Sequence, residues 1–214
     1  MELPMAEITF ITGGVRSGKS HLALLLAEQN STPVCFIATA EAHDEEMCQR
    51  ICQHRQERPS SWSTIEEPLQ LGSALAIACT RASTIIVDDL AIWLSNRLLR
   101  DAGDPDTAHW QSQIQHVERA LIQEINEALA TLPSAATIIF VSAEAGWGIV
   151  PIYPLGRAFR DVLGRLNQHI AQRAHSVYLT VAGFALDLRA LGMSVHSLDP
   201  KKIPRDYEAQ SSCT

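Results

Sequence analysis

Long apolar runs are missing from this chain, and so is the pattern of a secretory signal. The longest apolar runs, such as Leu22–Ala27, are far too short to span a bilayer. Residues 1–7 lack a basic region followed by an apolar stretch, so no signal peptide is predicted. Five cysteines, an odd number without regular spacing, do not indicate a disulfide framework. We therefore expect a cytoplasmic protein with no membrane span.

Excess positive charge is missing as well. The chain has 17 Lys and Arg residues against 24 Asp and Glu residues, which gives a formal net charge of −7. A general nucleic-acid binder usually presents a basic surface, so no nucleic-acid partner is expected. A local basic pocket for phosphate groups remains compatible with this balance.

Neither internal repeats nor low-complexity segments divide the chain. Its 214 residues, 46% of them hydrophobic, are enough to bury one full core. We expect one domain over residues 1–189. Residues 190–214 contain two prolines and a Ser-Ser-Cys-Thr end, and they are predicted to form a tail of uncertain order.

Short apolar runs alternate with longer segments of helical period. Strands are predicted at residues 8–12, 34–38, 84–88, 137–142 and 176–181. Helices are predicted at residues 21–29, 44–58, 69–79, 91–100, 108–132 and 155–173. Strands that are apolar throughout, with helices between them, favour a parallel sheet covered on both faces. The predicted fold class is therefore α/β, a three-layer sandwich with a mostly parallel central sheet, and its ligands should bind at the carboxyl ends of the strands.

A phosphate-binding loop follows the first predicted strand and opens the first predicted helix. It fits the pattern G-x-x-x-x-G-K-[ST] with Gly13, Gly14, Val15, Arg16, Ser17, Gly18, Lys19 and Ser20. The glycines allow a tight turn in which backbone N–H groups point at phosphate oxygens. Lys19 should reach the β- and γ-phosphates, and the hydroxyl of Ser20 should bind Mg²⁺. The loop places the sandwich among P-loop NTPase-type folds.

An apolar strand that ends in two acids, Asp88 and Asp89, supports this assignment. P-loop enzymes place an aspartate there to hold Mg²⁺, directly or through water. Asp88 lies nearer the strand end and is the predicted metal residue. The competing interpretation is that both acids only cap the following helix.

The segment from Arg50 to Pro59 combines basic residues with a histidine. On a helix, Arg50, His54 and Arg58 are spaced by four and share one face, while Met47 and Ile51 are placed to pack on the core. Like charge on the arginines disfavours the protonated histidine, and a neutral imidazole is a competent nucleophile toward phosphorus. On spacing alone, a solvated basic helix face is the favoured explanation of the pattern.

A zinc site is a further interpretation of the same region. His43, Cys48, Cys52 and His54 include suitable ligand types. The two cysteines stand one helical turn apart without a second pair, however, and His54 lies on a different face from Cys48. Buried small cysteines are the simpler explanation.

Taken together, the motifs resemble the bifunctional adenosylcobinamide kinase/adenosylcobinamide-phosphate guanylyltransferase family of cobalamin biosynthesis. The resemblance runs from Ile8 to about Arg189. The matching segments are residues 12–20, 36–40, 44–47, 50–51, 54–55, 58–59, 87–88, 93–96, 148–151, 159–161, 166–168 and 181–183.

The resemblance implies two reactions. In the first, a nucleoside triphosphate, ATP or GTP with Mg²⁺, phosphorylates the corrinoid adenosylcobinamide. In the second, GTP transfers GMP to an enzyme histidine and releases pyrophosphate, and the GMP then passes to adenosylcobinamide phosphate to give adenosylcobinamide-GDP. The family's guanylylated histidine falls on His54, which together with Lys19 forms the expected catalytic pair. The family also implies a homo-oligomer, expected to be a trimer.

The resemblance carries over further nucleotide contacts beyond the phosphate loop. They fall on Ala38, Thr39, Ala40, Arg55, Gln56, Glu57, Arg58, Glu66 and Asp88. One departure stands out, because Ala143 replaces the asparagine usual in the family and removes a polar group from the loop before residues 148–151. The alternatives are a P-loop small-molecule kinase and a nucleotide-binding regulatory module, both without guanylyl transfer.

Overall fold

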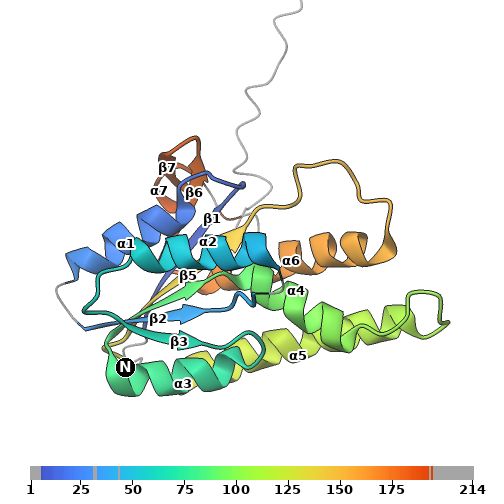
Figure 1. The fold of residues 1–214 in the computed structure, drawn as a ribbon, viewed down its shortest axis with the longest axis horizontal. Helices are drawn as coiled ribbons and strands as arrows, with labels where there is room; N and C mark the ends of the chain where they lie inside the picture. Colours follow the sequence, from blue (N-terminus) through green and yellow to red (C-terminus); the bar gives the residue numbers. More distant parts are fainter. Residues whose placement is uncertain (1–5, 31–32, 43, 193, 195–214) are drawn as a thin grey trace, which may run out of the picture.

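A computed structural model describes residues 6–30, 33–42, 44–192 and 194 (Figure 1). These residues form a seven-stranded sheet in the order β3-β2-β4-β5-β1-β6-β7. The strands are β1 (Glu7–Gly13), β2 (Val34–Ala38), β3 (Ser63–Glu66), β4 (Thr84–Asp88), β5 (Thr137–Ala143), β6 (Ser176–Val181) and β7 (Phe184–Asp187). Every neighbouring pair is parallel except β6 with β7, which is antiparallel. The predicted α/β class with a mostly parallel central sheet is confirmed.

Helices cover both faces of this sheet. They are α1 (Lys19–Gln29), α2 (Glu45–Gln56), α3 (Leu71–Arg81), α4 (Leu90–Asp101), α5 (Trp110–Ala130), α6 (Pro154–Arg173) and the short α7 (Leu188–Leu191). One buried cluster joins α3, α4, α5 and α6 to one face, and a smaller cluster packs α1 on the other. In Figure 1, α1 and α2 lie on the opposite side of the sheet from α3 and α5.

The helix α2 differs from the others because it makes little use of the core. Asp44 caps its N-terminus by accepting a hydrogen bond of 2.7 Å from the N–H of Met47, a contact worth about 1 kcal/mol in typical helices. None of its described residues belongs to either core cluster. Met47 and Ile51 are half-exposed, so the expectation that they pack on the core is wrong. The described side chains of α2 therefore line cavities rather than the core.

Two strands were not predicted, and both are edges of the sheet. Along β3, half-exposed and exposed residues alternate, and β7 is exposed over most of its length. Neither therefore has the continuous apolar run by which the inner strands are recognised.

The domain boundary expected after Arg189 falls within α7, and it stays a prediction because residues 195–214 lie outside the described part of the chain.

None of the helices in the described part of the chain combines the length and hydropathy that crossing a bilayer requires.

The parallel arrangement of the strands brings the carboxyl ends of β1, β2, β3 and β4 to one edge of the sheet. Across that edge Ala38 is paired in register with both Glu66 and Asp88. Three residues expected at the nucleotide site are thus neighbours by strand register alone.

Candidate active site

The phosphate loop leaves β1 at Gly13 and enters α1 at Lys19. Gly13 has no room for a side chain, because an added Cβ would lie 2.3 Å from Thr180 Oγ1 and 2.6 Å from Ser17 Oγ. Gly18 has a φ of 100°, in the left-handed region where glycine carries no steric penalty. As the cap residue of α1, Gly18 has no side chain to occupy the first-turn N–H groups, and the first turn holds no acidic residue. This helix end is suited to an anion.

A buried contact with the neighbouring strand holds the loop in shape. The hydroxyls of Ser17 and Thr180 lie 2.7 Å apart, and both residues are buried. The N–H of Gly183 also donates to the carbonyl of Ser17 at 3.0 Å. β6 and the turn that follows it thus brace the phosphate loop.

Lys19 and Ser20 point from the start of α1 toward the acidic end of β4. Lys19 Nζ donates to the carbonyl of Gly14 at 3.3 Å, so the ammonium group folds back over the loop. Ser20 Oγ donates to Asp88 Oδ1 at 3.3 Å. A hydroxyl and a carboxylate at this distance are the hard oxygen ligands that Mg²⁺ prefers, and the pair fits such an ion.

The two acids after β4 have different surroundings. Asp89 is the cap residue of α4 and accepts a hydrogen bond of 2.7 Å from the N–H of Ile92. Burial raises the pKa of Asp89 to about 6, and the neighbouring charge of Asp88 adds to this effect. Asp88 faces Ser20 instead. The helix-capping role and the contact with the phosphate loop are therefore divided between the two residues.

Thr39 belongs to the framework under the site. Its side chain is fully buried, and its hydroxyl donates to the carbonyl of Asp89 at 2.8 Å and accepts from the N–H of Asp89 at 3.0 Å. Asn96 Nδ2 donates to the carbonyls of Thr39 and Pro68, at 2.9 and 3.2 Å. Asn96 thereby ties the end of β2 to the segment that follows β3. This role explains a motif for which the sequence alone indicated no function.

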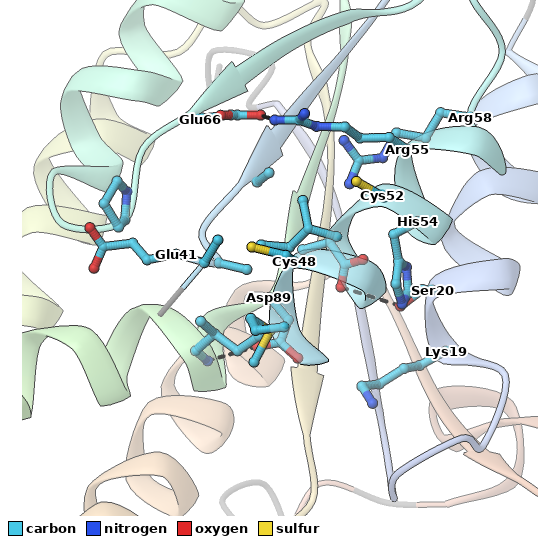
Figure 2. Close-up of a pocket in the computed structure, with 18 residues that line it drawn as sticks. Lys19, Ser20, Glu41, Cys48, Cys52, His54, Arg55, Arg58, Glu66 and Asp89 are labelled. Carbon is cyan, nitrogen blue, oxygen red and sulfur yellow. Dashed lines mark hydrogen bonds and ion pairs between the residues drawn. The ribbon is translucent and has the colours of Figure 1, made fainter. Parts of the chain in front are cut away.

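Two cavities flank α2. One, of about 530 Å³, lies between α2 and the ends of β2, β3 and β4. The other, of about 640 Å³, lies between α2 and the phosphate loop. Lys19, Ser20 and His54 line both, and Figure 2 shows the imidazole of His54 on the same side as Ser20. His54 thus stands at the boundary between the two cavities.

Two arginines project from α2 and the residues after it into the first cavity. Arg55 pairs with Glu66, and the dashed contact in Figure 2 joins them across the cavity. Arg58 stacks on the ring of Phe36, with its guanidinium carbon 3.5 Å from the ring centroid. Burial lowers the pKa of Arg58, and the charge of Asp88 opposes that effect. The Nη1 atom of Arg58 is buried without a hydrogen-bond partner among the described residues.

Most of the predicted site residues come together around these cavities. The first is lined by Lys19, Ser20, Ala38, Ala40, His54, Arg55, Arg58, Glu66 and Asp88, and the second by Arg16, Ser17, Gly18, Lys19, Ser20, His54 and Glu57. Gly13, Gly14, Val15, Thr39 and Gln56 line neither cavity. His54 Nδ1 lies 3.9 Å from Glu57 Oε2.

Sequence reasoning missed several lining residues, among them Glu41, Cys48, Cys52, Gln49 and Gln53. Cys48 with Cys52, and Gln49 with Gln53, are each spaced by four on α2, and this spacing is the signal that could have revealed two helix faces lining two cavities. The zinc interpretation stays untested with all four of its candidate ligands, although no group of three or more His, Cys, Asp or Glu residues is placed to hold a metal within the described ranges. Cys48 and Cys52 are exposed, so the expectation of buried small cysteines is wrong. His43 and the side chain of Arg50 lie outside the described part.

Comparisons with known proteins identify the family of the chain. The family described as cobinamide kinase / cobinamide phosphate guanyltransferase matches residues 9–188. The bifunctional adenosylcobalamin biosynthesis protein CobP of Pseudomonas aeruginosa is 42% identical over 179 residues, which cover 84% of this chain and 95% of that protein. The corresponding protein CobU of Escherichia coli is 35% identical over 181 residues, which cover 84% and 98%.

Among solved structures, a prototypical ATPase from the type III secretion system of pathogenic bacteria has a similar fold. Its TM-score is 0.50 at 9% identity, over 90% of this chain and 61% of that one, so the likeness extends to the fold alone. The family match and the two relatives, by contrast, cover most of the sequence. This chain therefore belongs to the cobinamide kinase / cobinamide phosphate guanyltransferase family.

Proposed function

We propose that the protein carries out two successive group transfers on a corrinoid. A nucleoside triphosphate first phosphorylates adenosylcobinamide. GTP then donates GMP to His54, and the guanylyl group passes to adenosylcobinamide phosphate to give adenosylcobinamide-GDP. The observation that carries the proposal is that His54 lines both cavities together with Lys19 and Ser20.

In the kinase step, the acceptor hydroxyl attacks the γ-phosphorus, and the bond to the β-phosphate oxygen breaks. Backbone N–H groups of residues 13–20 and the end of α1 hold the phosphates. Without nucleotide, the Nζ of Lys19 donates a hydrogen bond to the carbonyl of Gly14. When the triphosphate binds, it moves to the β- and γ-phosphate oxygens. Charge stabilisation and alignment, rather than covalent chemistry, supply the acceleration.

In the guanylyl step, a neutral ring nitrogen of His54 attacks the α-phosphorus. An N–P bond forms, the bond to the bridging oxygen breaks, and pyrophosphate leaves with the electron pair. A phosphate oxygen of the corrinoid then attacks the same phosphorus and releases the imidazole. Because His54 lies beside the phosphate-loop residues Lys19 and Ser20, one bound triphosphate can present either its γ- or its α-group.

Charged residues of the first cavity complete the proposed site. Arg55 and Arg58, which both line this cavity, neutralise oxygens of the transferring and leaving groups. The remaining proposed nucleotide contacts are Ala38, Thr39, Ala40, Gln56, Glu57, Glu66 and Asp88. Of these, Thr39 supports the site from beneath, because its hydroxyl is bonded to Asp89, its N–H to Asp88 and its carbonyl to Asn96.

Mg²⁺ is the proposed cofactor, with Ser20 and Asp88 as the residues that would hold it. When bound there with a triphosphate, the ion neutralises phosphate charge as a Lewis acid. We further propose a cytoplasmic location and a homotrimer, as the family resemblance implies.

The experiment is incubation with GTP labelled in its α-phosphate, followed by an alkaline quench. Wild type should retain alkali-stable, acid-labile label, and His54→Ala should retain none. His21→Ala is the matched control, because His21 lines the second cavity but lies on α1. Undiminished label in His54→Ala would sink the histidine mechanism. For the first reaction, Lys19→Ala should abolish phosphorylation of adenosylcobinamide, and unchanged turnover would refute the role of the loop.

A further inference from the structure

The loop between β5 and α6, residues 144–153, exposes an unusual amount of apolar surface. Trp147, Ile149, Val150, Ile152 and Tyr153 are between 60% and 96% exposed. Folded proteins seldom gather this many large apolar side chains on one exposed segment without a ligand or partner to cover them. In Figure 1 this loop arches away from the end of β5 before it enters α6.

Side chains of α6 hold the backbone of this loop in place. Arg160 Nη2 donates to the carbonyl of Gly146 at 2.8 Å, and Arg157 donates to the carbonyls of Pro151 and Ile152. Gly156 packs directly beneath Pro151, since a Cβ at Gly156 would lie 2.8 Å from the Pro151 ring. The apolar side chains are therefore presented by an anchored backbone, which lowers the entropy cost of binding against them.

The base of the loop is tied to the phosphate loop. The N–H of Glu144 donates to the carbonyl of Gly13 at 3.0 Å. Below it, Asn167 is buried and fixes the end of β5, because its Nδ2 donates to the carbonyl of Ala143 at 3.0 Å and its Oδ1 accepts from Ser142 at 2.7 Å. A molecule lying on the β5–α6 loop would therefore approach the triphosphate site from its β1 side, away from α2.

The position and the chemistry of the segment identify the occupant. Its base is bonded to the phosphate loop, so a molecule that covers it lies beside the triphosphate site. The proposed acceptor is a corrinoid, whose macrocycle has broad apolar faces that match the exposed side chains of the segment. The charges at the base, Glu144 with Arg157 and Arg160, are bonded to the loop's own backbone and leave the apolar face to make the contact.

We infer that the β5–α6 loop is the docking surface for the macrocycle of the corrinoid acceptor, and that Arg157 and Arg160 act as positioning residues beneath it. The inference rests on the proposed function, which supplies the acceptor. The macrocycle lies against Trp147 and its apolar neighbours, and its side-chain hydroxyl reaches toward the phosphate loop.

Steady-state kinetics with adenosylcobinamide test this inference. Trp147→Ala and Ile152→Ala should each raise the KM for adenosylcobinamide roughly tenfold, which corresponds to about 1.4 kcal/mol, with kcat and GMP labelling from GTP unchanged. Leu99→Ala is the matched control, because Leu99 is 67% exposed on α4. It should leave every parameter at the wild-type value.

A binding measurement tests the same inference without requiring turnover. Adenosylcobinamide should quench tryptophan fluorescence in wild type much more than in Trp147→Phe, since the corrin would lie against that indole. An unchanged KM in both alanine variants, or equal quenching in wild type and Trp147→Phe, would overturn the inference. A fall in oligomeric mass with unchanged corrinoid KM would assign the surface to a second copy of the chain and would also overturn it. Loss of GMP labelling in wild type would instead count against the proposed function.

Discussion

Replacing Gly13 by alanine should destabilise the protein far more than the same change at Gly14. The new Cβ would lie 2.3 and 2.5 Å from Oγ1 and the carbonyl oxygen of Thr180, and 2.6 Å from Ser17 Oγ. Thr180 and Ser17 are buried, and Thr180 is fixed in register beside Gly13, so neither can yield easily. Overpacking of this kind costs about 1–3 kcal/mol.

Other terms change the estimate only moderately. Displacing Thr180 also breaks its hydrogen bond with Ser17, which costs about 1 kcal/mol. Alanine restricts the unfolded chain and returns about 0.4–1 kcal/mol. The net loss is about 1–3.6 kcal/mol, which lowers the melting temperature by roughly 2–14 °C in a domain of this size.

Thermal unfolding of the nucleotide-free protein, followed by circular dichroism, measures this loss. Gly14→Ala is the matched control, because no atom lies within 4 Å of a Cβ built there. It should melt at or slightly above the wild-type temperature. Equal melting temperatures for the two variants would refute the argument that Thr180 and Ser17 close the space beside Gly13.

Three further predictions concern a buried acid, two ion pairs and the hydroxyl of Ser20. The pKa of Asp89 is raised from 3.8 to about 6, so the native state binds its proton more tightly than the unfolded state, and stability is lost as the pH rises through this window. Asp89→Asn keeps an acceptor for the helix cap but cannot ionise. In urea titrations at pH 4 and 7, the wild type should lose on the order of 2–3 kcal/mol more unfolding free energy between the two pH values than the variant, and an equal loss in both would contradict the prediction. Arg97, whose side chain is 11% exposed, donates to Glu124 at 2.6 Å and to Asp101 at 3.2 Å. Arg97→Ala should lower the unfolding free energy measured with denaturant by about 3 kcal/mol. The side chain of Arg165 is 52% exposed, so Arg165→Ala should lower it by less than about 1 kcal/mol, and equal losses would refute the distinction. Ser20→Ala should raise the Mg²⁺ concentration needed for half-maximal phosphorylation, and an unchanged Mg²⁺ titration would remove Ser20 from the metal site.

The inner strands could be predicted from sequence because each is a continuous apolar run with helices before and after it. The edge strands β3 and β7 could not, since their exposed positions carry mixed side chains and only pairing with a neighbour makes them strands. The antiparallel direction of β7 likewise follows from a tight turn at Ala182 and Gly183, both with positive φ, rather than from composition.

The site divides in the same way between local and long-range features. Residues 13–20 form a local motif whose shape depends on neighbours in the chain, and its position between β1 and α1 is as expected. The hydrogen bond between Thr180 and Ser17 joins residues 163 positions apart in the sequence, and the one between Asn96 and Thr39 joins residues 57 positions apart. No local pattern encodes such contacts. The shared position of His54 between two cavities depends on how far α2 stands from the sheet, which helical periodicity does not determine.

The central claim is that one histidine carries GMP between GTP and the corrinoid phosphate. Intact-protein mass measured after incubation with GTP and Mg²⁺ tests it most directly, with and without adenosylcobinamide phosphate. The account predicts a mass gain of one GMP that maps to His54 and disappears when adenosylcobinamide phosphate is added, as adenosylcobinamide-GDP forms. Formation of adenosylcobinamide-GDP at the wild-type rate by His54→Ala, with no covalent GMP on the protein, would contradict it.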